Sequence, residues 1–117
     1  MTDLRTRYLA CWDETDPEVL SDLLVHSWAQ QATYVDPLAQ TRGLSELMAV
    51  IRAAQQQFPG WRFSPVGEVE THHDVARFGW GLGPADAVPV ILGSDVVTLD
   101  PDGRIATVTG FLDRVPA

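Results

Sequence analysis

The sequence predicts an α+β domain in which three N-terminal helices pack on a strongly curved antiparallel sheet and form a cone with an internal pocket. Apolar residues recur every three or four positions as far as Pro59 and at every second position after it, so helices come first and strands follow. Glycine within a strand often marks a bulge or a bend, and strong curvature is therefore favoured by Gly79, Gly81, Gly93 and Gly110.

Length and composition indicate one soluble domain. The 117 residues fit a single domain spanning 1–117, and 45% hydrophobic with 21% charged residues is close to globular averages. The net charge of -8 combines sixteen acidic residues with eight basic ones, all arginine, which excludes nucleic acid and anionic membranes as partners. No apolar run approaches the ~18 residues of a membrane span. Cys11 is the only cysteine, so we expect a cytoplasmic protein without disulfides.

Helical spacing in the first half of the chain defines three helices. The first begins near Thr2 or Asp3, and its apolar face is formed by Leu4, Tyr8, Cys11 and Trp12. The second begins at Asp16-Pro17, an N-cap acceptor followed by a residue with helical φ, and its apolar face is formed by Leu20, Leu23, Leu24 and Trp28. The third follows Gly43 and stops at Pro59-Gly60, with an apolar face formed by Leu44, Leu47, Met48, Ile51 and Phe58.

The strands follow from a different pattern. Ala32 to Asp36 is too short for a helix, and the residue before Pro37 is pushed toward extended geometry, which predicts a short strand. After Pro59, period-two segments predict strands at Trp61 to Phe63, Val66 to His72, Val75 to Leu82, Val88 to Leu99 and Arg104 to Leu112. Short turns such as Pro101-Asp102-Gly103 separate them, and short turns favour antiparallel neighbours.

Several segments together resemble a known superfamily. They are Arg7-Tyr8-Leu9-Ala10 with Asp16 opening the second helix, Ala32-Thr33-Tyr34-Val35-Asp36-Pro37, Gly43, Gly93-Ser94-Asp95-Val96-Val97, and Asp102-Gly103-Arg104-Ile105. Over nearly its whole length the chain resembles the nuclear-transport-factor-two-like superfamily, and within it the SnoaL-like polyketide cyclases and the ketosteroid isomerases. The resemblance implies a cone-shaped fold, a pocket for an apolar small molecule and a homodimer.

The resemblance to the ketosteroid isomerases also implies three catalytic residues. Asp36 falls on their general base, while Tyr8 and Asp95 fall on their two oxyanion donors. The chemistry requires such a set, because removing a proton beside a carbonyl creates an enolate that correctly placed donors stabilise. A neutral Asp95 can donate if apolar surroundings raise its pKa, and it sits among Ile91, Leu92, Val96 and Val97.

Each of the three residues also has a purely structural interpretation. Asp36 is of a type that often caps a turn before a residue such as Pro37. Tyr8 on its own is typical of a core tyrosine whose hydroxyl bonds a carbonyl or a water. Asp95 points into the pocket only if strand alternation places it on one face with Gly93 and Val97, and a shift of one residue would turn it outward.

Aromatic and apolar side chains define the expected ligand. We expect the substrate to contact Trp12, Tyr34, Met48, Phe58, Phe78, Trp80, Val97 and Leu112, which favours an apolar, ring-shaped guest. We expect no cofactor and no metal, because the adjacent His72 and His73 would point to opposite faces of a strand.

The function that these patterns favour is a cofactor-independent isomerase or cyclase acting on an apolar carbonyl compound. The alternative is a non-catalytic ligand-binding or dimerisation module of the same fold. An epoxide hydrolase using Asp95 and Asp113 is less favoured, because Gly93 stands where an arginine is required. A homodimer would use the exposed side of the sheet, whose candidate residues include Arg62, Val66, Thr107 and Thr109.

Overall fold

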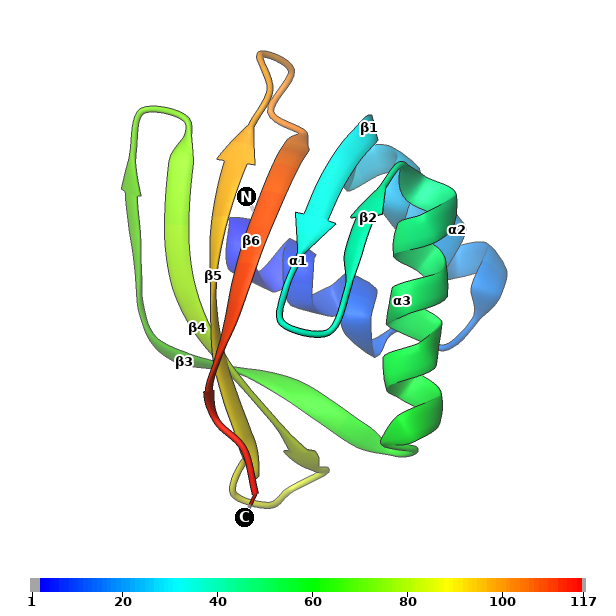
Figure 1. The fold of residues 1–117 in the computed structure, drawn as a ribbon, viewed down its shortest axis with the longest axis vertical. Helices are drawn as coiled ribbons and strands as arrows, with labels where there is room; N and C mark the ends of the chain where they lie inside the picture. Colours follow the sequence, from blue (N-terminus) through cyan, green and yellow to red (C-terminus); the bar gives the residue numbers. More distant parts are fainter. Residues whose placement is uncertain (1–2, 117) are drawn as a thin grey trace.

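The computed structural model describes residues 3–116 and confirms the predicted fold class (Figure 1). The elements in chain order are α1 (Leu4–Asp13), α2 (Pro17–Ser27), β1 (Trp28–Val35), β2 (Gln40–Arg42), α3 (Leu44–Gln57), β3 (Trp61–His72), β4 (Val75–Pro84), β5 (Ile91–Leu99) and β6 (Ile105–Arg114). Figure 1 shows the three helices gathered on one side of a sheet whose long strands twist and curve around them. The architecture is therefore a helix layer that closes one side of a curled sheet.

Local capping explains where the first two helices begin. Asp3 precedes α1, and its carboxylate accepts a hydrogen bond from the Thr6 amide at 2.8 Å. Asp16 precedes α2 and accepts from the amides of Glu18 and Val19, while Pro17 occupies the first helical position. These side chains satisfy amides that have no partner within the helix, which confirms both predicted starts.

Loss of the α2 cap has a predictable cost. We expect Asp16→Ala to lower the free energy of unfolding by about 1 kcal/mol, because the two amides lose their acceptor. Urea denaturation followed by circular dichroism measures this change. The control is Asp22→Ala on the same helix, which removes an equal charge from an exposed position and should change the free energy by less than about 0.5 kcal/mol. Equal losses in the two variants would mean that charge, not capping, is responsible.

The six strands form one sheet in the order β2-β1-β6-β5-β4-β3. All neighbouring pairs are antiparallel except β1 and β6, which run parallel with Val35 opposite Thr109. The prediction of a wholly antiparallel sheet is therefore wrong at this pair. Between β1 and β6 the chain passes through β2, α3, β3, β4 and β5, so no hairpin joins β1 to β6 and fixes their relative direction.

Several element boundaries also differ from the prediction, and the short strand β2 was not predicted. Trp28 was expected on the apolar face of the second helix but is the first residue of β1, where its side chain remains buried. The two predicted strands on either side of Pro65 form the single strand β3, whose pairing with β4 shifts between Val66 and Glu70. A burial pattern identifies an inward side chain, but it does not distinguish a helix end from a strand start.

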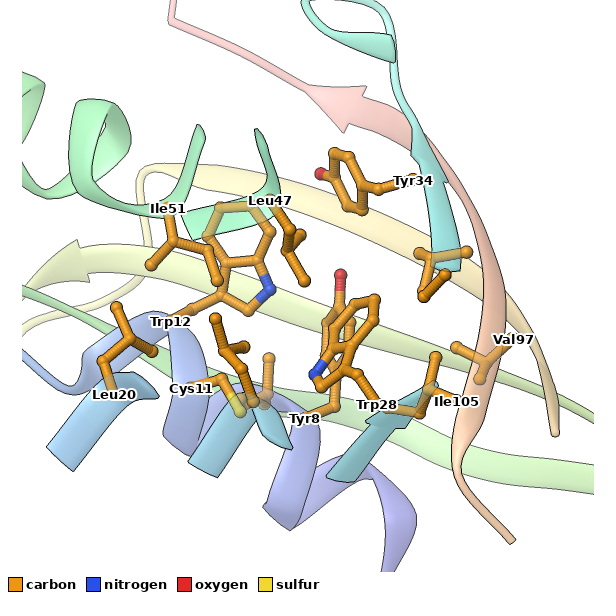
Figure 2. Packing of buried hydrophobic residues seen from close by; sticks show 14 of the residues in the cluster. Tyr8, Cys11, Trp12, Leu20, Trp28, Tyr34, Leu47, Ile51, Val97 and Ile105 are labelled. Atoms are coloured by element: carbon orange, nitrogen blue, oxygen red, sulfur yellow. The ribbon is translucent and has the colours of Figure 1, made fainter. Parts of the chain in front are cut away.

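The core lies between the helices and the sheet (Figure 2). Side chains from α1, α2, α3 and the strands contribute to it, and its fully buried members include Leu20, Leu24, Trp28, Leu47, Ile51, Ile105 and Val108. Within residues 3–116 no helix is long and apolar enough to cross a membrane. The core occupies only part of the space under the helices, and the remainder is an apolar cavity.

Candidate active site

An internal cavity of about 380 Å³ lies between the helices and the concave face of the sheet. Helices α1 and α3, strand β1 and strands β3 to β6 all contribute to its lining. At its outer end the lining includes the exposed side chains of Leu38, Phe111 and Val115, so the cavity opens to solvent there. A larger depression of about 510 Å³ lies outside the cone between α1 and β3, where Arg5, Asp13 and Arg62 make it polar.

The three residues predicted to be catalytic all line the internal cavity. Tyr8 reaches it from α1, Asp36 from the end of β1 and Asp95 from the middle of β5. The Asp95 side chain points inward, since the residue is only 2% exposed. The structure thus brings together a phenol and two carboxyl groups that are far apart in the sequence.

Asp95 is a buried acid held by a neighbouring indole. The Trp80 Nε1–H group donates a hydrogen bond of 3.1 Å to Asp95 Oδ2. Burial raises the pKa of Asp95 to about 6, although hydrogen bonding by Tyr8 and Trp80 opposes this rise, and the negative charges of Asp36 and Asp113 add to it. Near neutral pH such a carboxyl group can act as a proton donor or a proton acceptor.

Tyr8 is a fully buried phenol that keeps its proton. Its ring lies 5.3 Å from the Phe78 ring and 5.8 Å from the Trp28 ring, measured between centroids. Figure 2 shows its hydroxyl pointing away from α1, in the direction of Tyr34. Burial and the nearby charge of Asp95 raise the pKa of Tyr8 well above its usual value, so the hydroxyl is a hydrogen-bond donor at all physiological pH values.

Asp36 caps the turn that follows it and also accepts a hydrogen bond from Tyr34. Its Oδ1 atom accepts hydrogen bonds from the Leu38 and Ala39 amides, each at 2.8 Å, which is the turn-capping role. Its Oδ2 atom accepts from the Tyr34 hydroxyl at 2.5 Å. A carboxylate offers about four lone-pair sites. The turn and Tyr34 therefore leave Asp36 about one free site.

Sequence reasoning placed Tyr34 among the substrate contacts but missed its bond to Asp36. The two residues are separated by one position, so strand alternation puts their side chains on the same face. Burial, followed by the hydrogen bond to Asp36, raises the pKa of Tyr34. Tyr34 therefore remains a neutral donor to Asp36.

The pairing of Trp80 with Gly93 creates room for the indole that holds Asp95. The two residues lie directly opposite each other on β4 and β5. A β-carbon on Gly93 would overlap the Trp80 ring, so only glycine allows the indole to lie flat across the neighbouring strand. Gly93, which the sequence associates with sheet curvature, therefore also orients Trp80.

The cavity lining agrees with only part of the expected substrate contacts. It includes Trp12, Tyr34, Phe58, Trp80 and Leu112. Met48, Phe78 and Val97 were also expected there, but they pack in or against the core and do not line the cavity. Phe78 does not line the cavity because the Tyr8 ring packs edge-on against it.

Other lining residues were not among the expected substrate contacts. Phe63, Leu82 and Ile91 belong to inward faces of strands, and alternation with Trp80 or Asp95 was a signal for the last two. The remaining lining residues lie at a chain bend, on α3, or along β6 and just after it: Leu38, Ala54, Gln57, Gly110, Phe111, Val115 and Pro116.

Neither Asp113 nor Cys11 lines the cavity. Asp113 lies within β6, outside the cavity lining, and its carboxylate accepts a hydrogen bond of 2.9 Å from the Ser94 hydroxyl, so it does not face Asp95 as an epoxide hydrolase pair would require. Burial raises the pKa of the Cys11 thiol, which makes it a poor nucleophile. Within residues 3–116, no cluster of three or more His, Cys, Asp or Glu side chains is arranged to hold a metal ion.

The cone of three helices on a curled six-stranded sheet, with acids facing an apolar cavity, has the fold of the nuclear-transport-factor-two-like proteins. Residues 6–108 match the SnoaL-like domain, and the chain belongs to the SnoaL-like family. No curated protein matches the chain significantly.

Solved structures agree with this assignment. A candidate isomerase of the SnoaL-like family from Agrobacterium tumefaciens str. C58 is 43% identical, with 95% of each chain covered and a TM-score of 0.90. A candidate polyketide cyclase from Sinorhizobium meliloti is 22% identical over 94% of each chain, with a TM-score of 0.73. A Catenulispora acidiphila protein with a ketosteroid isomerase-like fold, solved with trimethylamine, is 16% identical, with 94% of this chain and 85% of that chain covered and a TM-score of 0.72. The last two similarities concern the fold alone.

Proposed function

We propose that the protein is a cofactor-independent isomerase or cyclase that moves a proton on an apolar carbonyl compound. In this proposal Asp36 removes a proton from the carbon beside the carbonyl, and Tyr8 and Asp95 donate hydrogen bonds to the carbonyl oxygen as it becomes an oxyanion. The observation that carries the proposal is that these three side chains line one cavity of about 380 Å³.

The protonation states of the two donors support these roles. Tyr8 keeps its proton because burial raises its pKa well above the usual value. Asp95 has a pKa of about 6, so part of it is protonated near that pH, and an oxyanion bound against it would favour its neutral, donating form. Donors fixed in a water-poor cavity stabilise the developing charge of the transition state more than the neutral ground state.

Asp36 has the features of a base that needs no further activation. It is partly exposed at the cavity, and the bonds from Tyr34, Leu38 and Ala39 hold its carboxylate in one orientation. The free lone-pair site is the one available to accept a proton from a ligand. A base that is already oriented avoids the entropy cost of finding its geometry during the reaction.

The lining defines the class of ligand. Trp12, Phe58, Phe63 and Trp80 present aromatic surface, and the polar groups of the cavity are few. Its volume of about 380 Å³ lies at the lower end of the ~300–1,000 Å³ of small-molecule pockets. We therefore propose a compact apolar ketone or a related enolisable compound of one or two rings as the substrate. The similarity to the Agrobacterium candidate isomerase, at 43% identity, supports isomerisation over other reactions of this fold.

Two measurements on the wild-type protein test the proposal. We expect a small β,γ-unsaturated cyclic ketone to be converted to its conjugated isomer, with the absorbance of the conjugated product as the readout. We also expect apolar ketones to quench tryptophan fluorescence, because Trp12 and Trp80 line the cavity. Quenching without turnover over a panel of such ketones would contradict the catalytic proposal.

The second candidate function is a non-catalytic ligand-binding or dimerisation module. The observation that favours it is the Asp36 carboxylate, which the turn amides and Tyr34 already occupy at three sites. For a pure dimerisation module, the ligand panel would leave tryptophan fluorescence unchanged.

We also propose a homodimer and a cytoplasmic location. Exposed positions on the sheet include Arg62 and Val66 on β3 and Thr109 on β6, and a second copy could cover an exposed side of the sheet. Sedimentation equilibrium would give the mass of a dimer for the wild type. The cytoplasmic expectation rests on composition and on the single cysteine.

A further inference from the structure

Gly110 lies between the two acids of the site. Strand β6 separates β1, which ends just before Asp36, from β5, which carries Asp95. In this sheet Gly110 is directly opposite Asp95, and the register of Val35 with Thr109 places Asp36 level with Gly110. The three residues therefore form one row across three adjacent strands.

The distances across this row show how the acids approach each other. Strands that flank a common neighbour are about 10 Å apart, which would normally separate their side chains. A β-carbon on Gly110 would lie 2.6 Å from Asp95 Oδ1 and 3.4 Å from Asp36 Cβ. The Asp95 carboxyl group thus leans over the Gly110 backbone into space that any other residue would fill.

We propose that Gly110 is a positioning residue: because it has no side chain, the Asp95 carboxyl group leans across β6 toward Asp36, and the two acids act as one coupled pair. The inference deepens the proposed function and rests on the same site. Trp80 orients the Asp95 carboxyl group, because its hydrogen bond to Asp95 Oδ2 leaves the other oxygen, Oδ1, above the Gly110 backbone.

Coupling gives the pair a chemical property that neither acid has alone. Two carboxyl groups close together resist a second negative charge, so the charge of one raises the pKa of the other. When Asp95 holds its proton, which its pKa of about 6 favours below that pH, the site contains a proton donor and a proton acceptor close to each other. For the proposed reaction this separates the roles, because Asp36 accepts the proton from carbon while Asp95 stays a donor.

The charges around Asp95 make this coupling measurable. Among residues 3–116, the ionisable groups that interact with Asp95 are Tyr8 from α1, Tyr34 from β1, Asp36 just after β1 and Asp113 from β6, and none of them is cationic. Asp36 is the stronger of the two carboxylates that raise the pKa of Asp95, and Asp113 is the weaker. Asp113 therefore provides a matched control for the removal of one charge.

The test is a ¹³C NMR titration of the side-chain carboxyl carbons in the intact protein. In the wild type we expect the Asp95 midpoint near 6. We expect Asp36→Asn to lower that midpoint by on the order of half a pH unit or more, as Coulomb's law gives for charges a few ångströms apart in a water-like medium. Asp113→Asn should produce a smaller shift. An unchanged midpoint in Asp36→Asn, or equal shifts in the two variants, would overturn the proposal.

A double-mutant cycle assigns the coupling to Gly110. In a Gly110→Ala protein we expect Asp36→Asn to shift the Asp95 midpoint by less than half of its effect in the wild type, because the added methyl group pushes the carboxyl group out of the gap. Thr109→Ala, an exposed neighbour on the same strand, should preserve the full effect. A full-sized shift in Gly110→Ala would show that the glycine does not bring the acids together.

The carboxyl titration tests this inference independently of the proposed function. The titration needs neither substrate nor turnover, so coupling without isomerase activity would refute the proposed reaction alone. Activity without coupling would refute the role of Gly110 alone. If Gly110→Ala fails to fold, the comparison of Asp36→Asn with Asp113→Asn still decides whether the acids are coupled.

Discussion

Asp36→Asn is expected to lower the isomerisation rate by about 10²- to 10⁴-fold, the usual contribution of a positioned general base. Asparagine is isosteric with aspartate, and its carbonyl oxygen can still accept from the Leu38 and Ala39 amides that the turn presents. Its amide group can donate to the Tyr34 oxygen, so the geometry of the turn survives. The variant therefore removes the base and keeps the cap.

The measurement is the initial rate of ketone isomerisation together with the unfolding free energy of the same samples. Asp113→Asn serves as the control, because it removes an equal charge from β6 outside the cavity lining and should retain most of the rate. Full activity in Asp36→Asn would show that Asp36 only caps its turn. Lost activity together with lost stability would mean that the asparagine fails as a structural substitute.

Asp95→Asn is expected to make the folded protein more stable at neutral pH, by on the order of 2 to 3 kcal/mol. Burial raises the pKa of Asp95 from 3.8 to about 6. A carboxyl group with a raised pKa binds its proton more tightly in the folded state, so its ionised form destabilises the fold. The destabilisation is absent below about pH 4, grows as the pH rises through 6 and is complete above it.

Urea denaturation of both proteins at pH 4 and pH 7.5 measures this difference. We expect similar stabilities at pH 4 and a clear advantage for Asp95→Asn at pH 7.5, with the Trp80 indole still bonded to the asparagine oxygen. Asp102→Asn, at an exposed acid of the β5–β6 hairpin, is the control and should show no such advantage. A wild type that equals or exceeds Asp95→Asn at pH 7.5 would contradict the prediction.

The same substitution should reduce turnover, because an amide N–H is a weaker donor than a carboxylic acid. Stability and activity would then change in opposite directions at one residue. A substitution that raises stability and lowers activity is typical of residues retained for function, since a buried carboxyl group has no structural advantage over its amide. An Asp95→Asn protein that is both more stable and fully active would point to the binding-module alternative.

Much of the fold was predictable because its signals are local. Asp3 and Asp16 cap the helices that follow them, and these contacts span only two or three residues. The strand pattern after Pro59 depends on alternation, which each segment carries by itself. The parallel pairing of β1 with β6 was not predictable in this way, because the paired residues are 74 to 77 positions apart and neither strand encodes the direction of the other.

For the candidate site, the residues were predictable but their arrangement in space was not. The sequence, read with the resemblance it carries, was enough to single out Tyr8, Asp36 and Asp95 and to predict that Asp95 points inward, because alternation along one strand determines the face of each side chain. That the three line one cavity depends on the sheet order, which places β6 between the acids.

Only the tertiary structure decided which groups hold the acids in place. The Trp80 bond to Asp95 and the space above Gly110 both arise between strands. Contacts of this kind depend on register, and register is a property of the assembled sheet, not of any one strand. The sequence and its resemblance therefore determined most of the elements and the identity of the candidate site residues, while the distances between these residues were decided by packing.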